Sequence, residues 1–294
     1  MKKKTKSNGE GKQGLVFCVY PEQYEIFDTR INKPICIKKI EGGIEVGSMV
    51  YQELDQISFK KKSLLYFQPN NVAILLSISK RFLNEAKSIF ESKIDPNKFD
   101  HSLDNAKGDR KRYLMEKSKI VCDFIENIQI SIVFSYTALE AFCNLSIPDD
   151  YEYKTEIKNK GTIEVYDKKA IERWIPLKEK LCKILPEIYQ TKKLENQIFW
   201  SYYVILEKYR NDIIHQKSIE RTEFYKNYFR KDLFNVCQSG EEIIKFFYEQ
   251  HSEKNKTNPL WPWLINKGKE FPLTTDFKSE NFEVVGNLYE GIKK

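Results

Sequence analysis

The sequence has little of what a metal site needs. Its 294 residues include only three histidines, His101, His215 and His251, which lie far apart and form no HExxH string. Zinc sites in proteins are built from clustered cysteine and histidine ligands. The six cysteines form no CxxC pair and have mostly apolar neighbours: Cys18, Cys36, Cys122, Cys143, Cys182 and Cys237. We therefore expect no metal cofactor, and reduced buried thiols of the kind found in cytosolic proteins.

Long apolar runs and phosphate-binding loops are also missing. The first apolar run after the basic N-terminus, residues 15–20, is too short for the core of a signal peptide. No run approaches the roughly 18 apolar residues that a membrane helix requires. The chain also has no P-loop, no GxSxG string and no glycine-rich phosphate loop. These absences predict a cytoplasmic protein with no membrane contact and no second catalytic domain.

The composition is that of a folded protein. Apolar residues make up 41% and aromatic residues 14% of the chain, which excludes wholesale disorder despite 31% charged residues. A length of 294 residues suits one large domain or two modest ones. The net charge of +7 is compatible with a polyanionic partner, but it is too small to indicate nucleic-acid binding by itself.

Composition shifts divide the chain into four parts. Residues 1–12 are basic, lack an apolar residue after Met1, and are expected to form a flexible tail. Residues 13–71 contain short β-prone runs separated by turn residues, which predicts a small antiparallel β-rich unit. Residues 72–255 are mostly helical, and residues 256–294 have no clear period. We expect this last part to strap over the helices, with Trp261 and Trp263 either packed in the core or stacked on bases.

The predicted fold is α+β and mainly α, with a helical bundle that carries an inserted β-hairpin. Apolar side chains recur at steps of three and four, which predicts helices over 72–93, 113–145 and 168–189, and a further helix from residue 195. Alternating residues over 151–165 predict the hairpin. Asp167 is a candidate helix cap, and Ser239 with Glu242 forms a candidate capping box for a last helix.

One segment of the predicted late helix gathers residues that can carry chemistry. Arg210 and His215 are five positions apart in the string RNDIIH. Asn211 lies four residues before His215, and Asp212 lies three before it, so both can share a helical face with the imidazole. Apolar residues of the same helix occupy the other side. The polar groups are therefore expected to lie together on a side that is not used for packing.

These residues resemble a known family. The string RNDIIH fits the R-x4-H motif of the HEPN superfamily, whose second position is usually Asn, Asp or His. The segment SYTALEAFCN, residues 135–144, is similar to the early-helix pattern of several HEPN groups in bacterial defence and toxin proteins. The resemblance covers roughly residues 110–250, about half of the chain.

The resemblance implies a metal-independent endoribonuclease that acts as a homodimer through the HEPN bundle, in phage defence or in a toxin–antitoxin system. RNA carries its own nucleophile, the 2′-hydroxyl, so the protein needs only to move protons and to stabilise charge. His215 is the expected acid or base, because imidazole titrates near neutral pH. Arg210 is expected to stabilise the phosphorane. Asn211 is expected to fix the imidazole tautomer or to hold the scissile phosphate.

Other residues have auxiliary roles in this hypothesis. Asp212 is expected to orient Arg210 or to bind a partner helix, and Glu140 points either to solvent or toward the motif. Lys208, Lys217 and Arg221 are expected to bind RNA. They belong to residues 208–231, where a net charge of +4 is interleaved with aromatic side chains, as suits single-stranded RNA.

Two interpretations from other classes stay open. The chain could be a catalytically silent HEPN module that binds RNA or a partner protein such as an antitoxin, or a purely structural helical interaction domain. In a purely structural role, Arg210 would be a surface residue paired with Glu207 or Asp212. His215 would then be an ordinary residue near a helix C-terminus, where the helix dipole favours a cation.

Overall fold

The computed structural model describes residues 12–17, 24–106, 108–156, 162–215, 221–252, 261–264, 273–274 and 282–287. The fold is α+β and mainly α, as the sequence predicted. The chain forms two compact units. The first combines Met1–Asn70 with His251–Lys294, and the second is Asn71–Gln250. The predicted flexible tail, residues 1–12, lies outside the described residues except for Lys12, which begins a strand.

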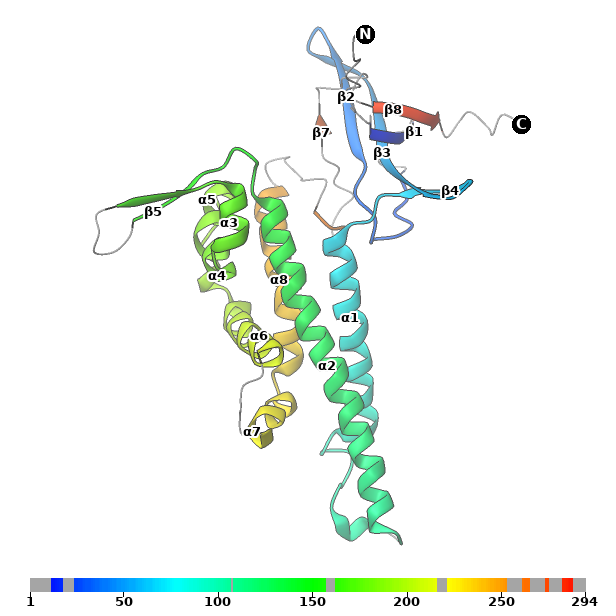
Figure 1. The fold of residues 1–294 in the computed structure, drawn as a ribbon, viewed down its shortest axis with the longest axis vertical. Helices are drawn as coiled ribbons and strands as arrows, with labels where there is room; N and C mark the ends of the chain where they lie inside the picture. The colour runs from blue at the N-terminus through cyan, green and yellow to red at the C-terminus, as the bar shows by residue number, and fades with distance from the viewer. Residues whose placement is uncertain are drawn as a thin grey trace, which may run out of the picture. The chain divides into compact units, whose positions relative to one another are not determined.

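The first unit is built on a six-stranded sheet of order β7-β2-β3-β1-β8, with β4 paired to β3 (Figure 1). Pairings of β3 with β1, β2 and β4 are antiparallel, as predicted. Its strands are β1 (Lys12–Phe17), β2 (Ile35–Glu41), β3 (Ile44–Phe59), β4 (Lys62–Phe67), β7 (Leu273–Thr274) and β8 (Phe282–Asn287). Gly42 and Gly43 join β2 to β3 with φ of 59° and 82°. These left-handed conformations suit a two-residue hairpin turn and favour glycine.

The C-terminal segment belongs to this sheet. β8 pairs in parallel with β1, and β7 pairs in parallel with β2. Trp261 and Trp263 are buried, and Trp263 packs with Tyr24, Cys36 and Val50. The prediction of core packing for the two tryptophans is therefore confirmed, whereas the expected strap over the helices differs from the structure. The sequence did not indicate these strands, because they have only two and six residues and therefore show no recognisable alternation of apolar and polar side chains. Their partner strands are also distant in the sequence.

The second unit is a helical bundle centred on α2 (Arg110–Ser146), which lies beside α1 (Asn71–Ile89) (Figure 1). Asp109 caps α2 by accepting hydrogen bonds from the N–H groups of Lys111 and Arg112. The remaining helices are α3 (Lys168–Trp174), α4 (Leu177–Glu179), α5 (Leu185–Tyr189), α6 (Ile198–Ile214), α7 (Arg221–Lys226) and α8 (Leu233–Ser252). A π-helical turn, Phe90–Ile94, follows α1, and a second one, Lys180–Ile184, joins α4 to α5.

By length and composition alone, α2 is apolar enough to cross a membrane. Half of its most apolar stretch is buried inside the structure. The buried side chains include Phe124, Ile128, Ile132, Leu139 and Phe142. A core helix of a soluble fold passes the same test, so we interpret α2 as the core helix of the bundle.

The predicted hairpin is present as β5 (Tyr153–Glu156) and β6 (Ile163–Tyr166), which pair antiparallel. Its expected turn, residues 159–161, lies outside the described residues. Asp167 caps α3 by accepting from the N–H of Ala170, as predicted. The capping-box prediction is wrong, because α8 begins at Leu233 and Ser239 is buried inside it. Its hydroxyl donates to the Val236 carbonyl oxygen at 2.7 Å.

Candidate functional site

The R-x4-H motif occupies the C-terminal end of α6. Tyr203, Leu206 and Tyr209 are buried and fix this helix in the bundle. An exposed face runs along the same helix at steps of four, three and four residues: Val204, Lys208, Asn211 and His215. This spacing places successive side chains on one side of a helix. Asn211 and His215 therefore share the solvent side of α6.

His215 is the first residue after the helix. Its backbone has φ −112° and ψ 42°, and its N–H still donates to the Asn211 carbonyl oxygen at 2.9 Å. The side chain is exposed. Its imidazole makes no hydrogen bond or ion pair with another described residue. The ring is available to a ligand or to a second protein chain.

Arg210 is held by two contacts. Its Nη1 donates to Asn211 Oδ1 at 3.0 Å, and its guanidinium carbon lies 4.9 Å from the centre of the Tyr136 ring on α2. Cation–π contacts of this length are favourable, more so where the groups are partly buried, as Arg210 is. Among the described residues, Arg210 forms no ion pair with Glu207 or Asp212. The structure therefore brings Arg210 together with Asn211, and Asn211 with the helical turn that ends at His215.

A polar cluster lies beneath Arg210. The hydroxyls of Tyr136 and Tyr203 both donate to Glu207 Oε1, at 3.4 and 3.3 Å. Burial raises the pKa of both phenols, and the Glu207 carboxylate raises them further. Both tyrosines are therefore neutral hydrogen-bond donors, and Glu207 is fixed by them rather than by Arg210. This cluster joins α6 to α2 and supports the ring on which Arg210 rests.

Glu140 extends the cluster toward a buried lysine. The Glu140 carboxylate raises the pKa of Tyr136, after burial and Glu207, and opposes the lowering of the Lys180 pKa by burial. Glu140 itself is half-buried on α2. Lys180 is only 1% exposed, and its Nζ donates to Asn144 Oδ1 at 2.8 Å and to the Glu172 carbonyl oxygen at 3.1 Å.

Of the other predicted site residues, two lie on α6 and two fall wholly or partly outside the described residues. Asp212 is half-buried, and its charge helps to raise the pKa of Tyr228, after burial. Lys208 is exposed on the same face as Asn211. Lys217 lies outside the described residues. Arg221 begins α7, but its side chain also lies outside them.

Sequence reasoning missed the residues that support the motif. Tyr136 lies in the segment SYTALEAFCN, yet nothing in the string indicates that its ring meets Arg210. Lys180 left a clearer signal, because it falls on the apolar side of a predicted helix, between Leu177 and Ile184. A lysine in such a position indicates a buried, hydrogen-bonded cation.

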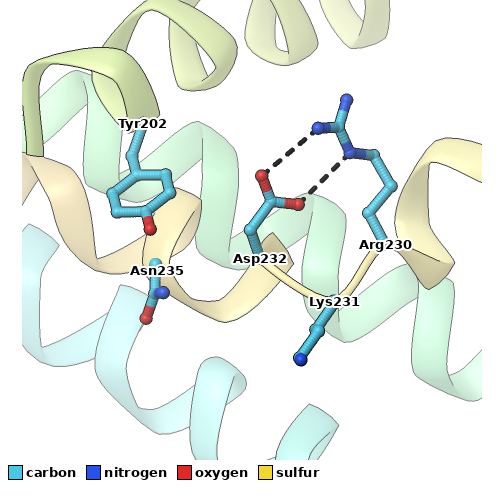
Figure 2. Close-up of a pocket in the computed structure, with 5 residues that line it drawn as sticks. All are labelled: Tyr202, Arg230, Lys231, Asp232 and Asn235. Atoms are coloured by element: carbon cyan, nitrogen blue, oxygen red, sulfur yellow. Dashed lines mark hydrogen bonds and ion pairs between the residues drawn. The ribbon is translucent and has the colours of Figure 1, made fainter.

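A shallow hollow of about 480 Å³ lies beside α6, lined by Tyr202, Arg230, Lys231, Asp232 and Asn235. Figure 2 shows the bidentate pair of Arg230 with Asp232, whose two N–O distances are 3.2 and 3.3 Å. The Lys231 side chain points away from this pair (Figure 2). Residues 230 and 231 of the predicted basic segment therefore lie next to α6, the helix that carries the R-x4-H motif.

Among the described residues, no group of three or more His, Cys, Asp and Glu side chains is placed to hold a metal ion. Four of the five described cysteines are at least partly buried, whereas Cys122 is exposed. Burial raises the pKa of Cys237 to about 12. No protein-family model, curated protein or solved structure matches the chain.

Proposed function

We propose that this chain is a HEPN-type, metal-independent endoribonuclease that cleaves RNA at the exposed face of α6. The observation that carries the proposal is the exposed imidazole of His215 one helical turn from Asn211, whose amide oxygen binds Arg210. A proton carrier, an amide and a guanidinium thus lie at one helix end. Together they match the needs of a reaction on a phosphodiester.

The reaction uses the 2′-hydroxyl of RNA as the nucleophile. A base removes its proton while the 2′-oxygen attacks the adjacent phosphorus, and an acid protonates the departing 5′-oxygen. The products are a 2′,3′-cyclic phosphate and a free 5′-hydroxyl. In this scheme His215 carries the protons, and Arg210 stabilises the charge that develops on the phosphorane oxygens. Asn211 holds either the guanidinium or the scissile phosphate.

A homodimer completes the site in this proposal. One chain offers a single His215, whereas the reaction needs a base and an acid. Val204 and Ile214 are 43% and 50% exposed on α6, and they flank the polar residues. Burying such apolar side chains against a second copy is favourable. The two histidines would then face one RNA strand.

The cellular setting is part of the same proposal. We place the protein in the cytoplasm, in phage defence or a toxin–antitoxin system, with RNA as substrate and an antitoxin or regulatory protein as a further partner. The sheet unit is then available to restrain the nuclease or to choose its substrate.

The test is RNA cleavage in the presence of EDTA, followed with labelled single-stranded RNA. His215→Ala is expected to abolish cleavage and to leave the dimer intact in sedimentation. Tyr136→Phe retains the ring under Arg210 and should retain most activity. Tyr136→Leu removes the ring and should lower kcat by about ten-fold, the scale of a cation–π contact. Full cleavage by His215→Ala would reject the proposal.

The rival function is a silent HEPN module that binds RNA or a partner protein. The contact of Arg210 with Tyr136 favours it, because the guanidinium is already occupied within one chain. RNA binding without cleavage, unchanged by Arg210→Ala, would support this function. Failure to bind any nucleic acid at low salt would instead indicate a structural interaction domain.

A further inference from the structure

A second hollow, of about 450 Å³, opens in the helical unit between the π-helical turn after α1 and the segment that joins α7 to α8. Five of its eleven lining residues are aromatic: Phe90, Phe124, Tyr228, Phe229 and Phe234. Its volume lies within the range of small-molecule sites, which are usually concave, largely apolar and supplied with a few polar groups. It contains none of the R-x4-H residues.

The rings form a connected wall. The Phe124 centre lies 5.3 Å from that of Phe229 and 5.8 Å from that of Phe90, and Phe90 meets Phe234 edge-on at 5.8 Å. Phe124 is buried, whereas Phe229 is 40% exposed and can offer a ring face to a ligand. Walls of this kind favour a planar ring, because aromatic faces stack on one another.

The π-helical turn supplies the polar side of the hollow. It begins at Phe90 and is closed by the N–H of Asp95, which donates to the Phe90 carbonyl oxygen at 2.8 Å. Asp95 Oδ1 accepts from the backbone and side-chain nitrogens of Asn97, both at 3.0 Å. Turns of this type often occur at functional sites. The Asp95 carboxylate is half-buried; Asn97 occupies its Oδ1, and its Oδ2, 4.0 Å from Lys98 Nζ, is the oxygen left to accept from the N–H edge of a ring.

Two cations also line this hollow. Arg230 and Lys231 line both this hollow and the one in Figure 2. Asp232 orients Arg230 through its bidentate pair. Lys231 is exposed and forms no ion pair with another described residue. Because Arg230 is already paired with Asp232, Lys231 is the lining cation that is available to an anion.

We propose that this hollow binds a nucleotide, either free or within single-stranded RNA. The base lies among the rings of Phe90 and Phe229, with an N–H edge toward Asp95. The phosphate lies at the mouth, next to Lys231. A planar ring with hydrogen-bond donors on one edge and an anionic group on the other side matches these three features together. The site is separate from the catalytic proposal and does not depend on it.

The first test is calorimetric titration of the full chain at low salt with AMP, GMP, CMP and UMP. At least one mononucleotide is expected to bind. Ribose 5-phosphate and the matching nucleoside, which each lack one half of the ligand, should bind at least ten-fold more weakly. Phe229→Leu keeps an apolar side chain but removes the ring, and Lys231→Ala removes the charge. Each should weaken binding about ten-fold, the scale of one stacked base or one charged contact.

Controls separate this site from its neighbours. Trp174→Leu removes a 64% exposed ring that does not line the hollow, and binding should be unchanged. His215→Ala should also bind nucleotide normally, so full cleavage by this variant would reject the nuclease and leave the nucleotide site standing. RNA is the source of the ligand if a short single-stranded RNA competes with the mononucleotide and if Phe229→Leu weakens the binding of that RNA. If the RNA does not compete, the ligand is a free nucleotide.

Two results would overturn the proposal. One is that no mononucleotide binds, and the other is that Phe229→Leu and Lys231→Ala bind it as tightly as the parent protein does.

Discussion

Single side chains that meet across helices hold the candidate site together: Tyr136 on α2 contacts Arg210 and Glu207 on α6. The spacing of Arg210, Asn211 and His215 could be read along one helix, because it depends only on helical geometry. The contact of Arg210 with Tyr136 joins two helices through residues that lie more than 70 positions apart in the sequence. Such contacts depend on packing, which no local periodicity specifies.

A second such contact anchors the hairpin and makes stability depend on pH. Glu179 Oε1 accepts from the Tyr153 hydroxyl and from Lys183 Nζ, both at 2.7 Å. The bond from Lys183, followed by that from Tyr153, lowers the pKa of the Glu179 carboxyl. A lowered folded-state pKa stabilises the protein above the unfolded pKa, about 4.3 for glutamate. This stabilisation is lost as the pH falls through the lower, folded-state pKa.

Glu179→Gln should therefore cost about 1 kcal/mol of unfolding free energy at pH 7, and the cost should shrink as the pH falls below about 4. Urea unfolding of both proteins at pH 7 and at pH 3.5 measures the difference. In a Lys183→Met background the same substitution should cost less at pH 7. A cost that does not change with pH would contradict this account of the ion pair.

At the scale of elements, long helices were predictable and their ends were not. The apolar stripes of α1 and α2 follow one period for many residues, and burial keeps them regular. The predicted start of α8 was wrong. The helix begins upstream of the predicted cap at Ser239, because Leu233 and Val236 are buried and stabilise the helix there. The β-hairpin was predictable from alternation. The parallel strands at the sheet edges were not, because their partners are more than 200 positions away.

The crossing of α8 and α2 depends on one glycine. A Cβ added at Gly240 would lie 2.5 Å from the Ser135 hydroxyl oxygen and 2.8 Å from the Ser135 carbonyl oxygen. Alanine favours a helix over glycine by about 1 kcal/mol. The clash with backbone should outweigh this gain, so Gly240→Ala is expected to destabilise the protein by roughly 1–3 kcal/mol.

Chemical denaturation measures this change, with Gly47→Ala as the control, because a Cβ at Gly47 would meet nothing within 4 Å. Adding Ser135→Ala to Gly240→Ala should restore only part of the lost stability, since the carbonyl oxygen stays in place. A Gly240→Ala protein as stable as the parent would show that the two helices can separate without cost.

At the scale of the whole molecule, the chain returns to its first unit after completing the second. The sequence indicated a β-rich front and a helical body, and the structure adds that residues near the C-terminus complete the front sheet. Trp263 is the side chain that anchors the C-terminal segment in the first unit. It is 5% exposed, and its ring stacks on that of Tyr24 with centres 6.4 Å apart and planes inclined by 17°.

Trp263→Ala should therefore destabilise the sheet unit by about 3–5 kcal/mol, the usual cost of removing a buried tryptophan. Hydrogen exchange measured by mass spectrometry is the suitable readout, because it reports each unit separately. Protection should fall in β2 and β3 and stay unchanged in α2 and α8. Trp174→Ala, which removes a 64% exposed ring from the helical unit, should leave both patterns as they were. Loss of protection throughout the chain would mean that the two units unfold together, and that the C-terminal segment stabilises the bundle as well as the sheet.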